Sequence, residues 1–260
     1  FCSLASGGRD INFDIKRVEG YRNFCNKLWN ASRFINLNID SFGISDKRSS
    51  TIVDHWIDFK FNETVVKVNK SFEEFRFDLA TKAIYEFVWY ELCDWFIELN
   101  KIDLHEEGSK KSEINRSMVD VLEKTLRLAH PLMPFITEDI WQQLKKYNCS
   151  KEKSITISSY PIESKELSDS GFNTIEWLKE VVSGIRNIRG ELSLKPSIQI
   201  PCIFKNGSDK EKGFLEEVEM YIVKLSGLKE ITWTNNESDS PPSSIFTKEN
   251  LKVLIPLELS

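Results

Sequence analysis

The strongest constraint on the fold is a helical repeat of apolar residues near the start of the chain. Side chains suited to a buried surface recur there at steps of three and four, at Val18, Tyr21, Cys25, Leu28, Ser32 and Ile35. This spacing places them along one side of an α-helix, because about 3.6 residues make one turn. The repeat therefore predicts an amphipathic helix over about residues 14–37 that packs one face against a core.

Four further segments carry enough apolar residues to form helices that pack beside the first. They cover residues 51 or 54 to 70, 74–100, 111–129 and 134–147. The segment at 74–100 has a broad apolar surface, so we expect it at the centre. His130 and Pro131 end the segment at 111–129, because the residue before a proline avoids the helical conformation. Five helices with short connections predict a mainly α fold, with an antiparallel helix bundle over residues 14–150.

A small α+β domain is predicted over residues 151–260, after a change in the pattern. Alternation of polar and apolar residues indicates a short strand or extended linker at 154–157 and a strand at 197–204. Pro201 favours a sheet edge for the latter strand. The remaining predicted elements are helices at 173–191 and 208–226, strands at 230–234 and 251–256, and a polar loop at 235–244. Residues 1–13 are predicted to be an irregular linker.

Charge and cysteine content limit the kind of protein and the kind of partner. The net charge is −5, so contact with a nucleic acid requires a local basic patch. No cysteine pair or Cys/His cluster has metal-ligand spacing, and we expect reduced thiols and a cytoplasmic protein without a metal site. The five cysteines are Cys2, Cys25, Cys93, Cys149 and Cys202. The sequence contains no apolar run of about 20 residues, so we expect no membrane partner.

The first predicted helix has an unusual second face. Asn23, Lys27, Asn30 and Phe34 recur at helical steps on the side away from the apolar repeat. A ring for stacking, amides for base edges and a cation for phosphate are the groups that proteins use on unstacked nucleotides. The alternative is that Phe34 packs against a neighbouring helix or loop, since exposed apolar residues are common.

Two other groups of side chains allow a functional and a structural interpretation. Glu91, Asp94 and Glu98 share one face of the third predicted helix, where paired carboxylates could act as acid and base. We expect them instead to pair with cations of a neighbouring helix, such as Arg22 or Arg33. On the helix at 173–191, Lys179, Arg186 and Arg189 form a basic face that either contacts phosphate or is simply solvated.

Several strings of residues resemble the valyl-tRNA synthetase family of class I aminoacyl-tRNA synthetases. They are GRDINFD at 8–14, GYRNFCNKLWNASRF at 20–34, YEFVW at 85–89, CDWFIE at 93–98, HPLMPFITEDIW at 130–141 and IRNIR at 185–189. The resemblance covers nearly the whole chain. It implies the helical anticodon-binding bundle of that family, followed by its small α+β junction domain.

The departures from the family define which part of it this chain resembles. The ATP-site signatures of the His-Ile-Gly-His and Lys-Met-Ser-Lys-Ser types are absent, and so are the editing domain and the C-terminal coiled coil. The resemblance therefore implies a C-terminal portion that is not catalytic by itself. Its parent would attach valine to tRNA with ATP and magnesium, bound in a catalytic core to which residues 1–13 would be the link.

The resemblance implies a partner and assigns roles to individual residues. The partner is the anticodon stem-loop of valine tRNA, bound by a monomer that also contacts its own catalytic core. Phe34 is expected to stack on a base, and Lys27 and Arg33 to donate to phosphate or base edges. Weaker candidates complete this anticodon site: Asn23, Asn30, Trp95 and Phe96. Lys179, Arg186 and Arg189 are expected to touch the tRNA backbone farther away.

Two readings outside nucleic-acid binding stay open at the level of the sequence. The first is a helical scaffold whose exposed rings bind another protein. The second is an intact enzyme that uses Glu91, Asp94 and Glu98.

Overall fold

The computed structural model describes residues 2–4, 15–147, 151–165, 171–234 and 242–256. The chain divides into two compact units, residues 1–170 and residues 171–260. The sequence places this boundary after residue 150. Residues 151–165 instead bond to the helices before them. The Tyr160 hydroxyl donates to the Leu128 carbonyl at 2.9 Å, and the Asn62 amide donates to the Ser164 carbonyl at 3.1 Å.

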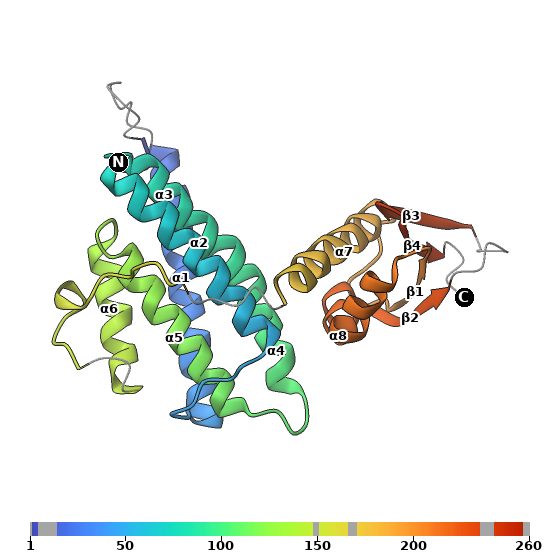
Figure 1. The fold of residues 1–260 in the computed structure, drawn as a ribbon, viewed down its shortest axis with the longest axis horizontal. Coiled ribbons are helices and arrows are strands. Elements are labelled where there is room, and N and C mark those ends of the chain that lie inside the picture. Colours follow the sequence, from blue (N-terminus) through green and yellow to red (C-terminus); the bar gives the residue numbers. More distant parts are fainter. Residues whose placement is uncertain (1, 5–14, 148–150, 166–170, 235–241, 257–260) are drawn as a thin grey trace. The chain divides into compact units, whose positions relative to one another are not determined.

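The first unit is the predicted helix bundle (Figure 1). Its helices are α1 (Ile15–Phe42), α2 (Ile52–Glu73), α3 (Phe77–Glu86), α4 (Ile97–His105), α5 (Lys111–Ala129) and α6 (Pro134–Leu144). The mainly α prediction is confirmed, and α5 has the predicted bounds. None of the helices in the described ranges is long and apolar enough to cross a membrane.

Local chemistry explains where these helices begin. Thr51 caps α2, because its hydroxyl accepts from the Asp54 amide while the Asp54 side chain accepts from the Thr51 amide. Pro134 begins α6, at a position where a helix does not use the missing N–H. The largest fully buried side chains include Trp56 of α2, Trp141 of α6 and Phe96, so the core lies between the helices.

The single helix predicted over 74–100 is three consecutive helical segments. Between α3 and α4, residues Phe87–Phe96 form a π-helix, which is wider than an α-helix. The broadly apolar sequence here indicates a helix but gives no separate signal for π-helical turns. Because π-helical turns are rare and are often found at functional sites, this segment is a candidate part of a functional site.

The prediction of a strand at 154–157 is wrong. Residues Ile155–Ile157 form a 3₁₀ turn, and the Ser154 hydroxyl accepts from the Thr156 amide at 3.2 Å. Glu138 of α6 accepts from the Ser154 hydroxyl at 2.8 Å and from the Ile155 amide at 3.2 Å. These local side-chain bonds take the backbone out of the extended form. His130 adds a contact of its Nε2 with the Thr156 hydroxyl at 3.0 Å.

In the second unit, a four-stranded mixed sheet is described together with two helices. The elements are α7 (Phe172–Glu191), β1 (Ile200–Lys205), α8 (Asp209–Ser226), β2 (Leu228–Thr234), β3 (Ser243–Lys248) and β4 (Leu251–Pro256). The strand order is β2-β1-β4-β3, with β1 and β2 parallel and connected through α8. The other neighbours are antiparallel. The prediction of a small α+β unit is therefore confirmed.

Two predictions about this sheet are wrong. β1 is interior rather than an edge strand, and it accommodates Pro201 because β4 pairs only with residues 203–205. A register shift between Ile200 and Pro201 also relieves the pairing with β2. The polar loop predicted to reach Ser244 ends earlier, since β3 begins at Ser243. Residues 235–241 of that loop lie outside the described residues.

The packing of α7 on the sheet depends on one glycine, which gives a test of the second unit. A Cβ added to Gly184 would lie 2.5 Å from Cγ of Phe246 on β3, whereas one added to Gly190 of the same helix would meet nothing within 4 Å. We expect Gly184→Ala to lower the free energy of unfolding by about 1–3 kcal/mol through overpacking. Gly190→Ala should leave it unchanged or raise it by about 0.5–1 kcal/mol through helix propensity. Urea denaturation followed by circular dichroism measures both. Equal effects of the two substitutions would show that the close approach of Phe246 does not matter.

Candidate nucleic-acid interface

The burial of α1 separates a core face from an outer polar face. The buried positions are Phe24, Leu28, Ala31, Ser32, Ile35 and Ile39. Leu28, Ser32 and Ile35 belong to the predicted apolar stripe. Val18 and Tyr21 are exposed instead, so the buried stripe begins at Phe24, nearly two turns later than predicted. On the outer face, Asn23 and Asn30 are exposed and have no side-chain bond within the described residues.

Lys27 occupies one flank of this polar face and is held on two sides. Its ammonium lies 2.6 Å from the Asp94 carboxylate and 4.0 Å from the centre of the Trp89 ring. Trp89 in turn stacks on Tyr85 at 5.5 Å, and Tyr85 stacks on Phe24 at 5.1 Å. A column of rings thus runs from the core to the ammonium. Lys27 is a positioned cation rather than a free one.

Phe34 lies on the same flank as Lys27 and is half-buried. The Lys101 ammonium of α4 is 5.1 Å from the centre of its ring, and Lys101 also pairs with Glu98 at 2.6 Å. Phe34 therefore has features of both interpretations, packing against neighbouring residues and stacking on a ligand. The ring packs partly against its neighbours, and it keeps some surface for a ligand beside a cation.

Trp95 and Phe96 differ in a way that their sequence does not reveal. Trp95 is half-buried and remains a candidate, whereas Phe96 is fully buried, with 0% of its surface exposed. The prediction for Phe96 is wrong, because a ring in the core cannot stack on a base. The structure places Trp89 beside Lys27 and Lys101 beside Phe34, so both become candidates that sequence reasoning missed. Trp89 ends the YEFVW string, which was a usable signal.

Arg33 lies on the exposed side of α1 and lines a depression that neither Lys27 nor Phe34 lines. This depression is formed with Trp29 and Lys146 among others. Within the described part of the chain, Arg33 makes no hydrogen bond or ion pair. The structure therefore separates Arg33 from the residues with which the sequence grouped it.

The three carboxylates of the enzyme hypothesis each have a cationic partner. Asp94 pairs with Lys27, Glu98 with Lys101, and the Glu91 carboxylate lies 3.8 Å from the Lys60 ammonium. Pairing was expected, but the suggested partners Arg22 and Arg33 were wrong. Separate ion pairs of this kind do not support a shared acid–base site. Among the described residues, no three His, Cys, Asp or Glu side chains gather closely enough to hold a metal ion.

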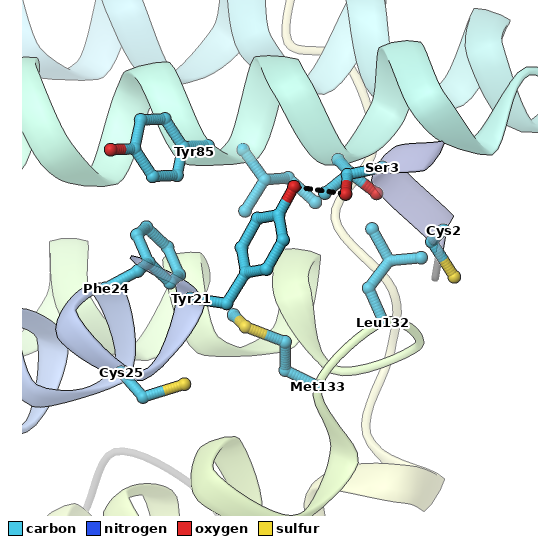
Figure 2. Close-up of a pocket in the computed structure, with 10 residues that line it drawn as sticks. Cys2, Ser3, Tyr21, Phe24, Cys25, Tyr85, Leu132 and Met133 are labelled. Atoms are coloured by element: carbon cyan, nitrogen blue, oxygen red, sulfur yellow. Dashed lines mark hydrogen bonds between the residues drawn. The ribbon is translucent and has the colours of Figure 1, made fainter. Parts of the chain in front are cut away.

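An apolar cavity of about 360 Å³ is a second candidate for a catalytic site. Figure 2 shows the Tyr21 hydroxyl hydrogen-bonded to Ser3, with the thiols of Cys2 and Cys25 nearby. None of the described residues that line it carries a carboxylate, imidazole or amine that could activate a thiol. Burial also raises the pKa of the Cys25 thiol, and a protonated thiol is a poor nucleophile. The cavity therefore does not support the enzyme hypothesis.

The basic face predicted on α7 is mostly used within the second unit. The Arg189 guanidinium is buried and donates to the carbonyls of Gly227, Lys195 and Ile198 at 2.9–3.2 Å. Its predicted contact with an RNA backbone is wrong, because those bonds occupy it. Arg186 is exposed but donates to the Leu225 carbonyl, and Lys179 pairs with Glu176 at 2.9 Å.

The contrast between Phe34 and Phe96 can be tested through stability. Phe96→Ala should lower the free energy of unfolding by about 3–5 kcal/mol, because it removes a fully buried ring. Phe34→Ala should lower it by less than about 1.5 kcal/mol, since fully burying such a ring is worth about 1.5–3 kcal/mol and this one is half-buried. Urea denaturation of both variants provides the comparison. A loss at Phe34 as large as that at Phe96 would assign Phe34 to the core and remove it from the interface.

The sequence of this chain is similar to a known protein family and to several longer proteins. A family model described as "Anticodon-binding domain of tRNA ligase" matches residues 54–203. The valine–tRNA ligase of Francisella tularensis subsp. tularensis is 40% identical over 262 residues, which cover 99% of this chain and 28% of the relative. Those of Coxiella burnetii and Legionella pneumophila are 36% and 40% identical, and each match covers 99% of this chain and 29% of the relative. The chain thus spans less than a third of the length of these relatives.

Proposed function

The chain belongs to the family of anticodon-binding domains of tRNA ligases, and on that premise we propose that it binds the anticodon stem-loop of valine tRNA. The matched range does not include α1, but the valine–tRNA ligase relatives cover it. We place the contact on α1 and on the π-helical segment Phe87–Phe96 beside it.

The observation that carries this proposal is the composition of the outer face of α1. A half-buried ring, Phe34, shares that face with the ammonium of Lys27 and the unbonded amide of Asn30. Residues at these spacings lie within about 60° of one another around the helix. One unpaired base can therefore meet a stacking surface and hydrogen-bonding groups at the same time.

Each side chain has a distinct proposed role. Phe34 stacks on a base, with Lys101 near the ring to meet a phosphate. Asn30 and Asn23 contact base edges with amides that can both donate and accept. Trp95, which belongs to the π-helical segment, borders the site on the side of that segment. The local cations favour RNA although the whole chain carries a charge of −5.

Lys27 requires a separate consideration because it already has partners. Its pair with Asp94 is partly exposed, and such pairs contribute about 0–1 kcal/mol. A base or phosphate can therefore compete for the ammonium at little cost. The ring of Trp89 keeps the ammonium in place in the free protein, so binding does not have to order a flexible side chain.

We further propose that the activity associated with this chain is that of a valine–tRNA ligase acting in the cytoplasm as a monomer. ATP and magnesium would be bound by a catalytic core in the parts of the relatives that this chain does not match. Arg186 and Lys179 stay weaker candidates for contact with the tRNA backbone.

A protein-binding role has one observation in its favour. Phe75, Phe77 and Leu79 are exposed around the start of α3, and the rings of Phe75 and Phe77 lie 6.5 Å apart. Clustered exposed apolar side chains often mark protein contacts. This alternative is compatible with RNA binding, since the catalytic core of the same ligase is a partner of this kind.

The decisive experiment measures binding of the chain to an anticodon stem-loop of valine tRNA. Phe34→Ala should weaken this binding by about 1–3 kcal/mol, the range for loss of one aromatic–base stack. Phe135→Ala is a matched control, because Phe135 is an aromatic side chain that is 89% exposed and lies on α6, outside the residues proposed for the site. Fluorescence anisotropy at two salt concentrations supplies the affinities. Equal affinity for an unrelated tRNA stem-loop would contradict anticodon recognition.

A further inference from the structure

The depression beside Arg33 is a second pocket on the opposite flank of α1. It lies between α1, α6 and the 3₁₀ turn Lys145–Tyr147 and has a volume of about 410 Å³. This volume is within the range of about 300–1,000 Å³ that is usual for small-molecule sites. The residues that line it are Trp29, Ser32, Arg33, Asn36, Leu37, Gln143 and Lys146.

The lining has the character of a site for an aromatic anion. Trp29 presents an indole ring that is 39% exposed. Arg33 and Lys146 supply two cations, and none of the described residues that line the pocket carries a carboxylate. Arg33 has no partner among the described residues, so its guanidinium is available to a ligand.

One wall of the pocket is held in place before any ligand arrives. The Tyr147 hydroxyl donates to Oδ1 of Asn36 at 2.8 Å, which ties the 3₁₀ turn to α1. The Asn36 amide nitrogen donates to the Ser32 carbonyl at 3.0 Å. The Lys146 ammonium lies 4.8 Å from the centre of the Tyr147 ring. Such an arrangement reduces the ordering cost of binding.

The position of Trp29 relative to Phe34 suggests what the ligand is. Five residues separate them, which places their side chains about 140° apart around α1 and about 7.5 Å apart along its axis. Asn30 and Arg33 lie on the exposed surface between them. A single-stranded loop that crosses α1 can therefore reach both rings.

We propose that this pocket binds a second unpaired nucleotide of the RNA loop whose other base stacks on Phe34. Trp29 stacks on the base, and Arg33 and Lys146 contact its phosphates. Gln143 contacts the edge of the base. The proposal rests on the RNA-binding function proposed above and adds a subsite to it.

The lining favours a nucleotide over other anions. A free phosphate would use Arg33 and Lys146 but would leave the indole of Trp29 without a role. A nucleotide uses both, because its base stacks on a ring and its phosphate pairs with cations. The two rings on either side of Asn30 then explain why the exposed face of α1 is bordered by aromatic side chains.

The experiment uses the full chain and stem-loops that carry the fluorescent base 2-aminopurine at one loop position at a time. Stacking on a ring changes the emission of this base. We expect binding to change the emission at two positions. Phe34→Ala should abolish the change at one and Trp29→Ala at the other. Trp29→Phe should retain both changes, and Phe135→Ala is the matched control for an exposed ring on the neighbouring helix.

The salt dependence of binding tests the two cations independently. Replacing both Arg33 and Lys146 by Gln should reduce the slope of log affinity against log salt by about 1.4, because each contact with a single-stranded phosphate contributes about 0.7. This double variant also decides the matter if Trp29→Ala does not fold. An unchanged slope would overturn the assignment of these cations to the RNA.

The failure of the subsite and the failure of the proposed function give different results. If Phe34→Ala abolishes one emission change and Trp29→Ala abolishes none, the RNA binds but the second subsite is wrong. If no stem-loop binds to the unmodified chain at any salt concentration, the proposed function fails and the subsite fails with it.

Discussion

The rotation of α1 about its own axis is the constraint on which the candidate interface depends. Leu28 and Ile35 have no exposed surface, and burying each is worth about 1.5–3 kcal/mol. A turn of the helix by even one residue position would expose them. Their burial therefore determines which residues face solvent, and it places Asn30 outside with Lys27 and Phe34 at one border and Trp29 at the other. The core of the bundle and the polar surface of α1 are two consequences of one helical period.

The π-helical segment adds a second constraint on the same surface. It carries Trp89, Asp94 and Trp95, and Asp94 and Trp89 both meet Lys27. A π-helix spaces its side chains differently from an α-helix, so these contacts would not all form on a regular helix of the same sequence. The bundle thus presents Lys27 as an ordered group although its pair with Asp94 is exposed and individually weak.

Some features of the structure could be predicted from the sequence, and others depend on tertiary packing. The bounds of α5 could be predicted, because Pro131 marks its end and its apolar repeat is long. The π-helix could not, because π-helical turns are rare and the broadly apolar segment at 74–100 shows no clear break in its helical pattern. Trp95 and Phe96 are adjacent and similar in type, and only tertiary packing makes one half-buried and the other fully buried. The same holds for Arg189, whose role depends on the Gly227 carbonyl, 38 residues away.

The internal hydrogen bonds of Arg189 reduce the positive charge that a chain of net charge −5 can offer to RNA. A cation that holds three backbone carbonyls cannot also release counterions from phosphate, so the basic pattern of α7 overstates the charge that it offers to a partner. In the first unit the opposite is true, because Arg33 is unpaired within the described residues and Lys27 is only weakly paired. A cation contributes most to RNA binding when it has no strong partner within the protein. By that criterion, α1 and the residues that border it are better suited to RNA than the helix with the more obvious basic pattern.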